Sequence, residues 1–166
     1  ENVAVGRNAL YSNLSSYNTA VGRAALAGNT TGNSNSAFGR DALRYNITGD
    51  RNVAIGVSAL LFNTSGIKNT AVGHNSLQNN TIGTNNSAFG LYALLNNTTG
   101  ISNTAIGASA LQSNTTGAYN VALGIGTLYS NTTAYNNVAL GNIALHSNTT
   151  GYSNVALGSG TSVFKF

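Results

Sequence analysis

The stretch Asn18-Thr-Ala-Val-Gly22 decides the fold, because a close variant of it returns at a fixed interval along the chain. The first interval is 16 residues and every later one is 17. A period this regular predicts a stack of structural units in which each unit contacts only its neighbours. The repeats open at Asn2, Asn18, Asn35, Asn52, Asn69, Asn86, Asn103, Asn120, Asn137 and Asn154.

The first five positions of each repeat, counted from its opening asparagine, are typical of a short strand. Position 1 is always Asn, position 3 always Ala, position 5 always Gly, and position 4 always Val, Phe, Ile or Leu. Side chains alternate along a strand, so Asn, Ala and Gly share one small, close-packed face. Positions 2 and 4 share the opposite face, which is branched and apolar.

The second half of the repeat leaves two interpretations open. Position 9 is Leu in nine repeats, usually after Ala, and position 12 is Asn in the same nine. Ala-Leu favours a single turn of helix, but so short a segment also permits an irregular strand. Positions 12 to 15 often read Asn-Thr-Thr-Gly, which predicts a tight corner, because Asn and Thr bond nearby backbone groups and Gly accepts positive φ.

The sequence therefore predicts an all-β fold, with one-turn helices left open, over residues 1–166: a parallel β-roll or β-solenoid of ten 17-residue coils. Like positions stack about 4.8 Å apart, so the asparagine columns become ladders of amides. The chain has no Met and its first repeat begins at once, so we expect it to be a segment of a longer protein. The last repeat loses its Ala-Leu, and we expect residues 163–166 to cap the stack or lead into a further domain.

The composition argues for order and for self-association. Large apolar residues are scarce, yet only 6% of residues are charged, whereas disordered chains usually carry high net charge. Two large apolar side chains per coil offset little of the entropy lost on ordering 17 residues. We therefore expect an obligate oligomer, intertwined or side by side, that buries a continuous stripe at position 4 or at position 9.

Several functions lack the residues they need. The acids are Glu1, Asp41 and Asp50, and the histidines His74 and His146 lie four coils apart, so we expect no enzyme and no cofactor. The repeats lack the Asp of calcium-binding solenoids, and there is no cysteine, so we expect no metal. A sparse net charge of +4 does not suit nucleic acid, and no apolar run is long enough to enter a membrane.

Two sets of residues are candidates for ligand contact. Arg7, Arg23 and Arg40 share position 6 of consecutive repeats, so they form a column that is either a solvated edge or a site for anions, such as acidic glycans or lipopolysaccharide phosphate. Tyrosines at positions 10 and 16 flank the corners, where their rings either pack across turns or stack on sugars. These tyrosines are Tyr11, Tyr17, Tyr129, Tyr135 and Tyr152.

The corners also contain asparagines in the glycosylation pattern Asn-x-Thr, as in Asn131-Thr-Thr. Their fixed place in the repeat indicates turn chemistry first.

The unit Asn-x-Ala-(Val/Ile/Leu)-Gly resembles the head repeats of trimeric autotransporter adhesins of the YadA type. The longer repeat with Ala-Leu and Asn-Thr-Thr-Gly is similar to repeats of phage tail fibres and bacterial surface fibres, over residues 2–158. The resemblance implies a left-handed coil, three chains around one axis, and an extracellular role as the shaft or head of a fibre on a cell or virion. A cell-surface glycan or lipopolysaccharide is the ligand that such a role implies.

Two other functions remain open at this stage. Columns of Thr and Asn on a flat face could match a water lattice, as in an ice-binding solenoid, although adjacent threonines at a corner point to different faces. An amyloid-like matrix protein would form open-ended filaments instead of closed trimers.

Overall fold

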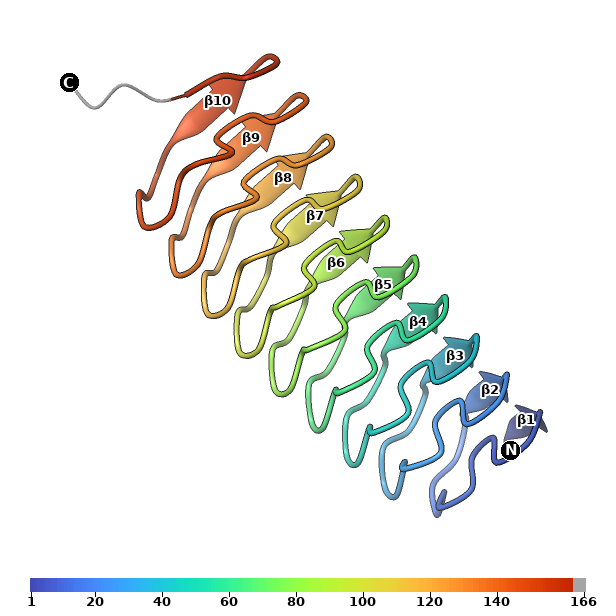
Figure 1. The fold of residues 1–166 in the computed structure, drawn as a ribbon. Coiled ribbons are helices and arrows are strands. Elements are labelled where there is room, and N and C mark those ends of the chain that lie inside the picture. Colours follow the sequence, from blue (N-terminus) through green and yellow to red (C-terminus); the bar gives the residue numbers. More distant parts are fainter. Residues whose placement is uncertain (163–166) are drawn as a thin grey trace.

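The computed structural model describes residues 1–162, which form ten short parallel strands stacked in sequence order (Figure 1). Neighbouring strands pair along one ten-stranded sheet, and no helix occurs among these residues. The expected cap at residues 163–166 lies outside the described part. The strands are β1 (Val3–Val5), β2 (Thr19–Val21), β3 (Ser36–Phe38), β4 (Val53–Ile55), β5 (Thr70–Val72), β6 (Ser87–Phe89), β7 (Thr104–Ile106), β8 (Val121–Leu123), β9 (Val138–Leu140) and β10 (Val155–Leu157).

The strand register places like positions one above another, as the period predicts. Between β6 and β7, Ala88 lies beside Ala105 and Phe89 beside Ile106, and the other strand pairs follow the same rule. The shorter first repeat keeps this register too, since Val3 pairs with Thr19. The chain is therefore a parallel β-solenoid in which each repeat is one coil.

The core is narrow and is built from alanine and leucine. The position-3 alanines of β2 to β9 and the position-9 leucines of coils 2 to 8 have no accessible surface. The small face predicted for positions 1, 3 and 5 thus packs inward against leucines from the other side of the same coil. Alanine fits there because the two sides of a coil lie close together.

Two asparagine ladders run through the interior, as predicted. In the corner ladder at position 12, Asn97 Nδ2 donates to Asn80 Oδ1 at 2.8 Å, and Asn114 Nδ2 donates to Asn97 Oδ1 at 2.8 Å. In the strand ladder at position 1, Asn103 accepts from the backbone N of Asn120 at 3.1 Å. Within residues 1–162 every buried side-chain nitrogen or oxygen has a partner, so the ladders compensate for the burial of so many amides.

The one-turn helix favoured by Ala-Leu does not form. Residues at positions 7 and 9 adopt positive φ, including a leucine in each of the first nine coils, for example Leu94 at +51°. The N–H groups of Leu94 and Asn96 bond to Ala110 O and Gln112 O of the next coil, whereas the N–H groups of Ala93, Leu95 and Asn97 each bond to the carbonyl three residues back. Because the next coil accepts alternate N–H groups, the segment forms consecutive tight turns that direct Leu inward and does not form a helix.

Glycine at position 5 is required by close approach between coils. Gly73 has φ +133°, and a Cβ on it would lie 2.5 Å from the carbonyl oxygen of Gly90. Position 15 is less strict, since coil 8 carries Ala134 there. The bond from Asn131 Nδ2 to Ala134 O is 3.4 Å, compared with 3.0 Å from Asn97 Nδ2 to Gly100 O.

Candidate functional site

The largest candidate surface is a row of apolar side chains along the outer face of the sheet. Position 4 points away from the core in every strand, and within coils 3 to 9 these side chains are about as exposed as Ile106, at 40%, except Val72, which is half-buried. No charged residue occurs in any of the ten strands. We call this row the outer stripe: Val5, Val21, Phe38, Ile55, Val72, Phe89, Ile106, Leu123, Leu140 and Leu157.

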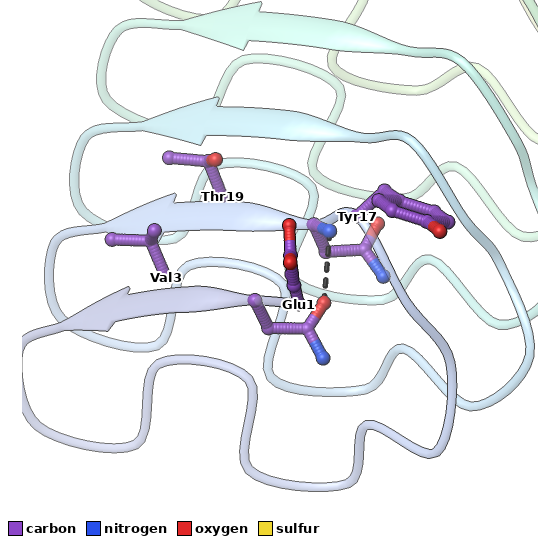
Figure 2. Close-up of a pocket in the computed structure, with 6 residues that line it drawn as sticks. Glu1, Val3, Tyr17 and Thr19 are labelled. Atoms are coloured by element: carbon purple, nitrogen blue, oxygen red, sulfur yellow. Dashed lines mark hydrogen bonds between the residues drawn. The ribbon is translucent and has the colours of Figure 1, made fainter.

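Position 2 runs beside the outer stripe on the same face. It carries Val, Thr or Ser, and Figure 2 shows Val3 and Thr19 one above the other on adjacent strands. These small side chains leave the larger position-4 groups standing above the sheet. The outer face is therefore flat, uncharged and apolar along one line.

Of the two stripes expected to be buried by association, only one is available. The leucines at position 9 are already buried inside their own coil, as Leu60, Leu77 and Leu94 show. The outer stripe remains exposed on a single chain. Of the two positions, only position 4 therefore leaves large apolar side chains accessible on the surface.

The arginine column lies where the sequence predicts it, but its members differ. Backbone bonds from Ala24 N to Arg7 O and from Asp41 N to Arg23 O place the arginines in consecutive coils. Arg40 Nε lies 3.5 Å from Asp41 Oδ2, and Arg44 Nη1 lies 3.2 Å from Asp41 Oδ1. Arg40 is therefore partly neutralised, whereas Arg7 and Arg23 make no ion pair among the described residues.

A second pair of cations escaped the sequence reasoning. Arg51 and Lys68 share position 17 of coils 3 and 4, directly before the strand, and both are exposed. Their N–H groups bond to Asn33 O and Asp50 O, each one coil back. The arginine column follows the strand and this pair precedes it, so cations lie at both ends of the outer face in the N-terminal coils. Identical positions in adjacent repeats were the signal that could have found them.

The candidate tyrosines divide into stacked and isolated rings. Tyr129 stacks on His146, and Tyr135 stacks on Tyr152, each pair with centroids 5.0 Å apart and planes within 3°. Tyr11 and Tyr17 lie in the first coil and belong to none of the stacked pairs of residues 1–162, although both are well exposed. Packing across turns, the first of the two interpretations, accounts for the two stacks.

Another stack was missed at the sequence level. Tyr45 and Phe62 both occupy position 11, and their ring centroids are 5.5 Å apart in parallel planes. His74 meets Tyr92 edge to face at 6.0 Å. Each histidine thus contacts an aromatic ring.

The one hollow described among residues 1–162 offers few groups for binding or catalysis. A shallow, open hollow on the first coils is lined by Glu1, Val3, Tyr17 and Thr19 together with Asn2 and Asn18, and a hydrogen bond from Asn18 N to Asn2 Oδ1 crosses its floor (Figure 2). Its one titratable acid is Glu1. Within residues 1–162 no three His, Cys, Asp or Glu side chains come together to hold a metal ion, and no helix is long and apolar enough to span a membrane.

Comparisons with protein-family models, with curated proteins and with solved structures give no match.

Proposed function

We propose that this chain is a structural and adhesive segment of an extracellular fibre, in which three copies associate side by side through the outer stripe. The observation that carries the proposal is the row of ten apolar side chains on one face, eight of them exposed and two, Val21 and Val72, half-buried. At about 4.8 Å per coil this row is about 43 Å long. Contiguous apolar surface on this scale is typical of an interaction site and is unfavourable in water.

The geometry of the stripe suits copies that lie parallel to one another. Rotation about an axis parallel to the solenoid brings each coil against the same coil of its neighbour, so every position-4 side chain meets a position-4 side chain. Such an arrangement closes on itself and leaves no stripe exposed. Three copies, rather than two, is the number that the resemblance to trimeric fibres supports.

The rest of the surface suits a fibre exposed to solvent. Residues 69–164 carry no charge, and the corners present Asn, Ser and Thr. The backbone ladders and asparagine ladders hold adjacent coils together along the whole stack, which favours a stiff rod. A stiff, inert rod can hold a binding end away from a surface or contribute weak contacts of its own.

The alternative, an ice-binding solenoid, receives less support. Such a surface needs free hydroxyls in a flat array, but threonines at position 13 donate to the next coil, as Thr98 Oγ1 does to Thr115 O at 3.1 Å. On the outer face of the sheet, position 2 carries Val in five of the ten strands and Thr or Ser in the others, and an apolar residue always lies beside it at position 4. Thermal hysteresis above that of a control protein would favour ice binding over the fibre role.

The proposal is tested by comparing the same substitution at two isoleucines, one on the outer stripe and one away from it. Ile106 lies on the outer stripe, whereas Ile82 is at a corner and is 54% exposed. In sedimentation velocity, Ile106→Asp should sediment as a lighter species or fail to fold, and Ile82→Asp should sediment like the unchanged protein. If Ile106→Asp forms the same assembly with the same melting temperature, the outer stripe is not the seam.

If Ile106→Asp fails to fold, a second measurement on the unchanged protein still tests whether the outer stripe is the association surface. An assembly held by the outer stripe gains stability with concentration, because only the folded state associates. The melting temperature of the unchanged protein should therefore rise with each tenfold increase in concentration. A melting temperature that is independent of concentration would contradict the proposal.

A further inference from the structure

Three tyrosines and a histidine gather beside two adjacent corners toward the C-terminal end. The stacks of Tyr129 on His146 and of Tyr135 on Tyr152 both lie in coils 8 and 9, on either side of the corners. Tyr119 lies one coil earlier and is 56% exposed. Residues 69–164 contain no charged residue, so this aromatic region is also uncharged.

The stack of Tyr135 on Tyr152 ends abruptly in the coil below. The N–H of Asn136 bonds to Ala118 O and the N–H of Ser153 bonds to Tyr135 O, both at 3.1 Å. These bonds place residues 118, 135 and 152 in one column at position 16. Alanine ends at Cβ, so the ring face of Tyr135 directed toward coil 7 has no ring beneath it, and Tyr135 remains 44% exposed.

The next member of the column is another large apolar side chain. Ile101 occupies position 16 of coil 6, and the N–H of Tyr119 bonds to Ile101 O at 3.1 Å. Coils 6 and 8 are about 9.6 Å apart, two strand spacings. Between Ile101 and Tyr135 the column carries Ala118, whose side chain ends at Cβ. We call this space the tyrosine notch, formed by Ile101, Ala118, Tyr119 and Tyr135.

We propose that the tyrosine notch binds one neutral hexopyranose unit of a surface polysaccharide, stacked on the free face of Tyr135. The C–H face of a pyranose carries partial positive charge and suits the electron-rich face of a tyrosine ring. Its hydroxyls project sideways, toward the exposed Asn136 and the phenol of Tyr119. Tyrosine provides this contact with little loss of conformational entropy.

The absence of charge determines the class of sugar. An acidic sugar or a phosphate is bound tightly where a cation faces it, and the cations of the described residues lie in the first four coils. The notch therefore selects neutral sugars, and any acidic ligand belongs to the arginine column. This inference rests on the proposed fibre role, because the corner stays on the outside when the outer stripe is covered.

The test uses a variant that fills the notch without removing any aromatic ring. Ala118→Tyr should add a third ring beneath Tyr135, in the geometry that Tyr135 and Tyr152 already adopt. Tyr135→Ala removes the binding face. Tyr129→Ala is the matched control, since it breaks the other stack of the same two coils.

The probes are neutral hexasaccharides of glucose, mannose and N-acetylglucosamine, with polygalacturonate as the acidic comparison. Binding is measured by saturation-transfer NMR and by tyrosine fluorescence, which is unobscured because the chain has no Trp. At least one neutral hexasaccharide should bind, and Ala118→Tyr and Tyr135→Ala should each weaken it tenfold or more. Tyr129→Ala should bind within twofold of the unchanged protein, and circular dichroism should show that all variants remain folded.

Three results would overturn the inference: no binding of any neutral probe, polygalacturonate binding that Tyr135→Ala weakens as much as it weakens neutral-probe binding, or undiminished binding by Ala118→Tyr. The mass in solution, measured on the same samples, separates this inference from the fibre proposal. Binding by a single-chain species would retain the tyrosine notch and refute the trimer. A trimer that binds no sugar would support the fibre proposal and refute the tyrosine notch.

Discussion

The corner ladder of asparagines can be broken by a change of one atom, Asn97→Asp. Asn97 Nδ2 donates to Asn80 Oδ1 at 2.8 Å and to Gly100 O at 3.0 Å, and its Oδ1 accepts from Asn114 at 2.8 Å. Aspartate keeps the shape and the acceptor but replaces the donating nitrogen with an oxygen. It therefore removes two donated bonds and turns two oxygens toward each other inside the core.

The cost follows from these contacts. Two lost hydrogen bonds account for about 2 kcal/mol, and Asn80 Oδ1 is left buried without this donor. Gly100 O keeps a second donor, Asn86 Nδ2, at 2.8 Å. A buried carboxylate without a cation adds more, so at pH 7 we expect a loss of about 3–5 kcal/mol in the free energy of unfolding.

The same substitution predicts a pH dependence of defined sign. Burial among acceptors raises the pKa of the introduced carboxyl in the folded state above its unfolded value of about 3.9. The folded variant is therefore relatively stabilised below the unfolded pKa, and this stability is lost as the pH rises through the folded pKa. A protonated carboxyl can also donate one bond, which restores part of the ladder at acid pH.

Urea unfolding followed by circular dichroism, at fixed protein concentration and from pH 3.5 to 7.5, measures both effects as differences from the unchanged protein. Asn96→Asp is the matched control, because Asn96 is only partly buried and its Oδ1 accepts a bond from Asn79 that aspartate retains. It should cost less than about 0.5 kcal/mol. Equal stability of the two variants at pH 7 would refute the conclusion that the ladder holds the coils together.

Three further changes test the core, the close approach of the coils and the buried corners. Leu94→Ala should cost about 2–5 kcal/mol in urea unfolding because Leu94 is fully buried, whereas Leu91→Ala, at an exposed site, should cost less than about 0.5 kcal/mol, and similar costs would contradict the assignment of the core. Gly73→Ala should prevent stable folding, since its Cβ would lie 2.5 Å from a carbonyl oxygen, while Gly126→Ala, whose nearest contact is 3.3 Å, should remain folded by circular dichroism. In a eukaryotic secretory host, a glycan on Asn131 should be found only on protease-sensitive protein, because this side chain is buried and donates to the corner ladder; protease-resistant glycosylated protein would contradict this.

The strand half of each coil could be predicted because its alternating pattern of residues is compatible with only one local structure, a strand with a small inward face. Invariant Asn, Ala and Gly at alternate positions require an inward face with no room for larger groups, and the buried Ala88 and exposed Phe89 confirm that alternation. The amide ladders followed from identical residues in register. Each of these predictions needs only the period and the alternation of a strand.

The turn half could not be predicted from the propensity of Ala-Leu. Positive φ at a leucine is unfavourable by itself, and it persists because the N–H of that leucine bonds to the next coil and its side chain fills the core. Position 7 did contain a signal, since it carries Asn8, Asp41, Asn75 and Gly126, and Asn, Asp and Gly tolerate positive φ best. Hydrogen bonds and packing between coils therefore outweigh the helix propensity of Ala-Leu.

The surface features were only partly predictable. The arginine column and the stack of Tyr135 on Tyr152 follow from equal positions in consecutive repeats. The ion pairs of Asp41 depend on side-chain directions that the period does not determine. The tyrosine notch depends on a small residue, Ala118, beside a large one, and this contrast has meaning only once the column is known to stack.

The native mass in solution, measured by multi-angle light scattering on the unchanged protein, tests the central claim most directly. The outer stripe should be covered by two further copies, so the account predicts three times 16.9 kDa across a wide concentration range. A single-chain mass for a folded, stable protein would contradict it.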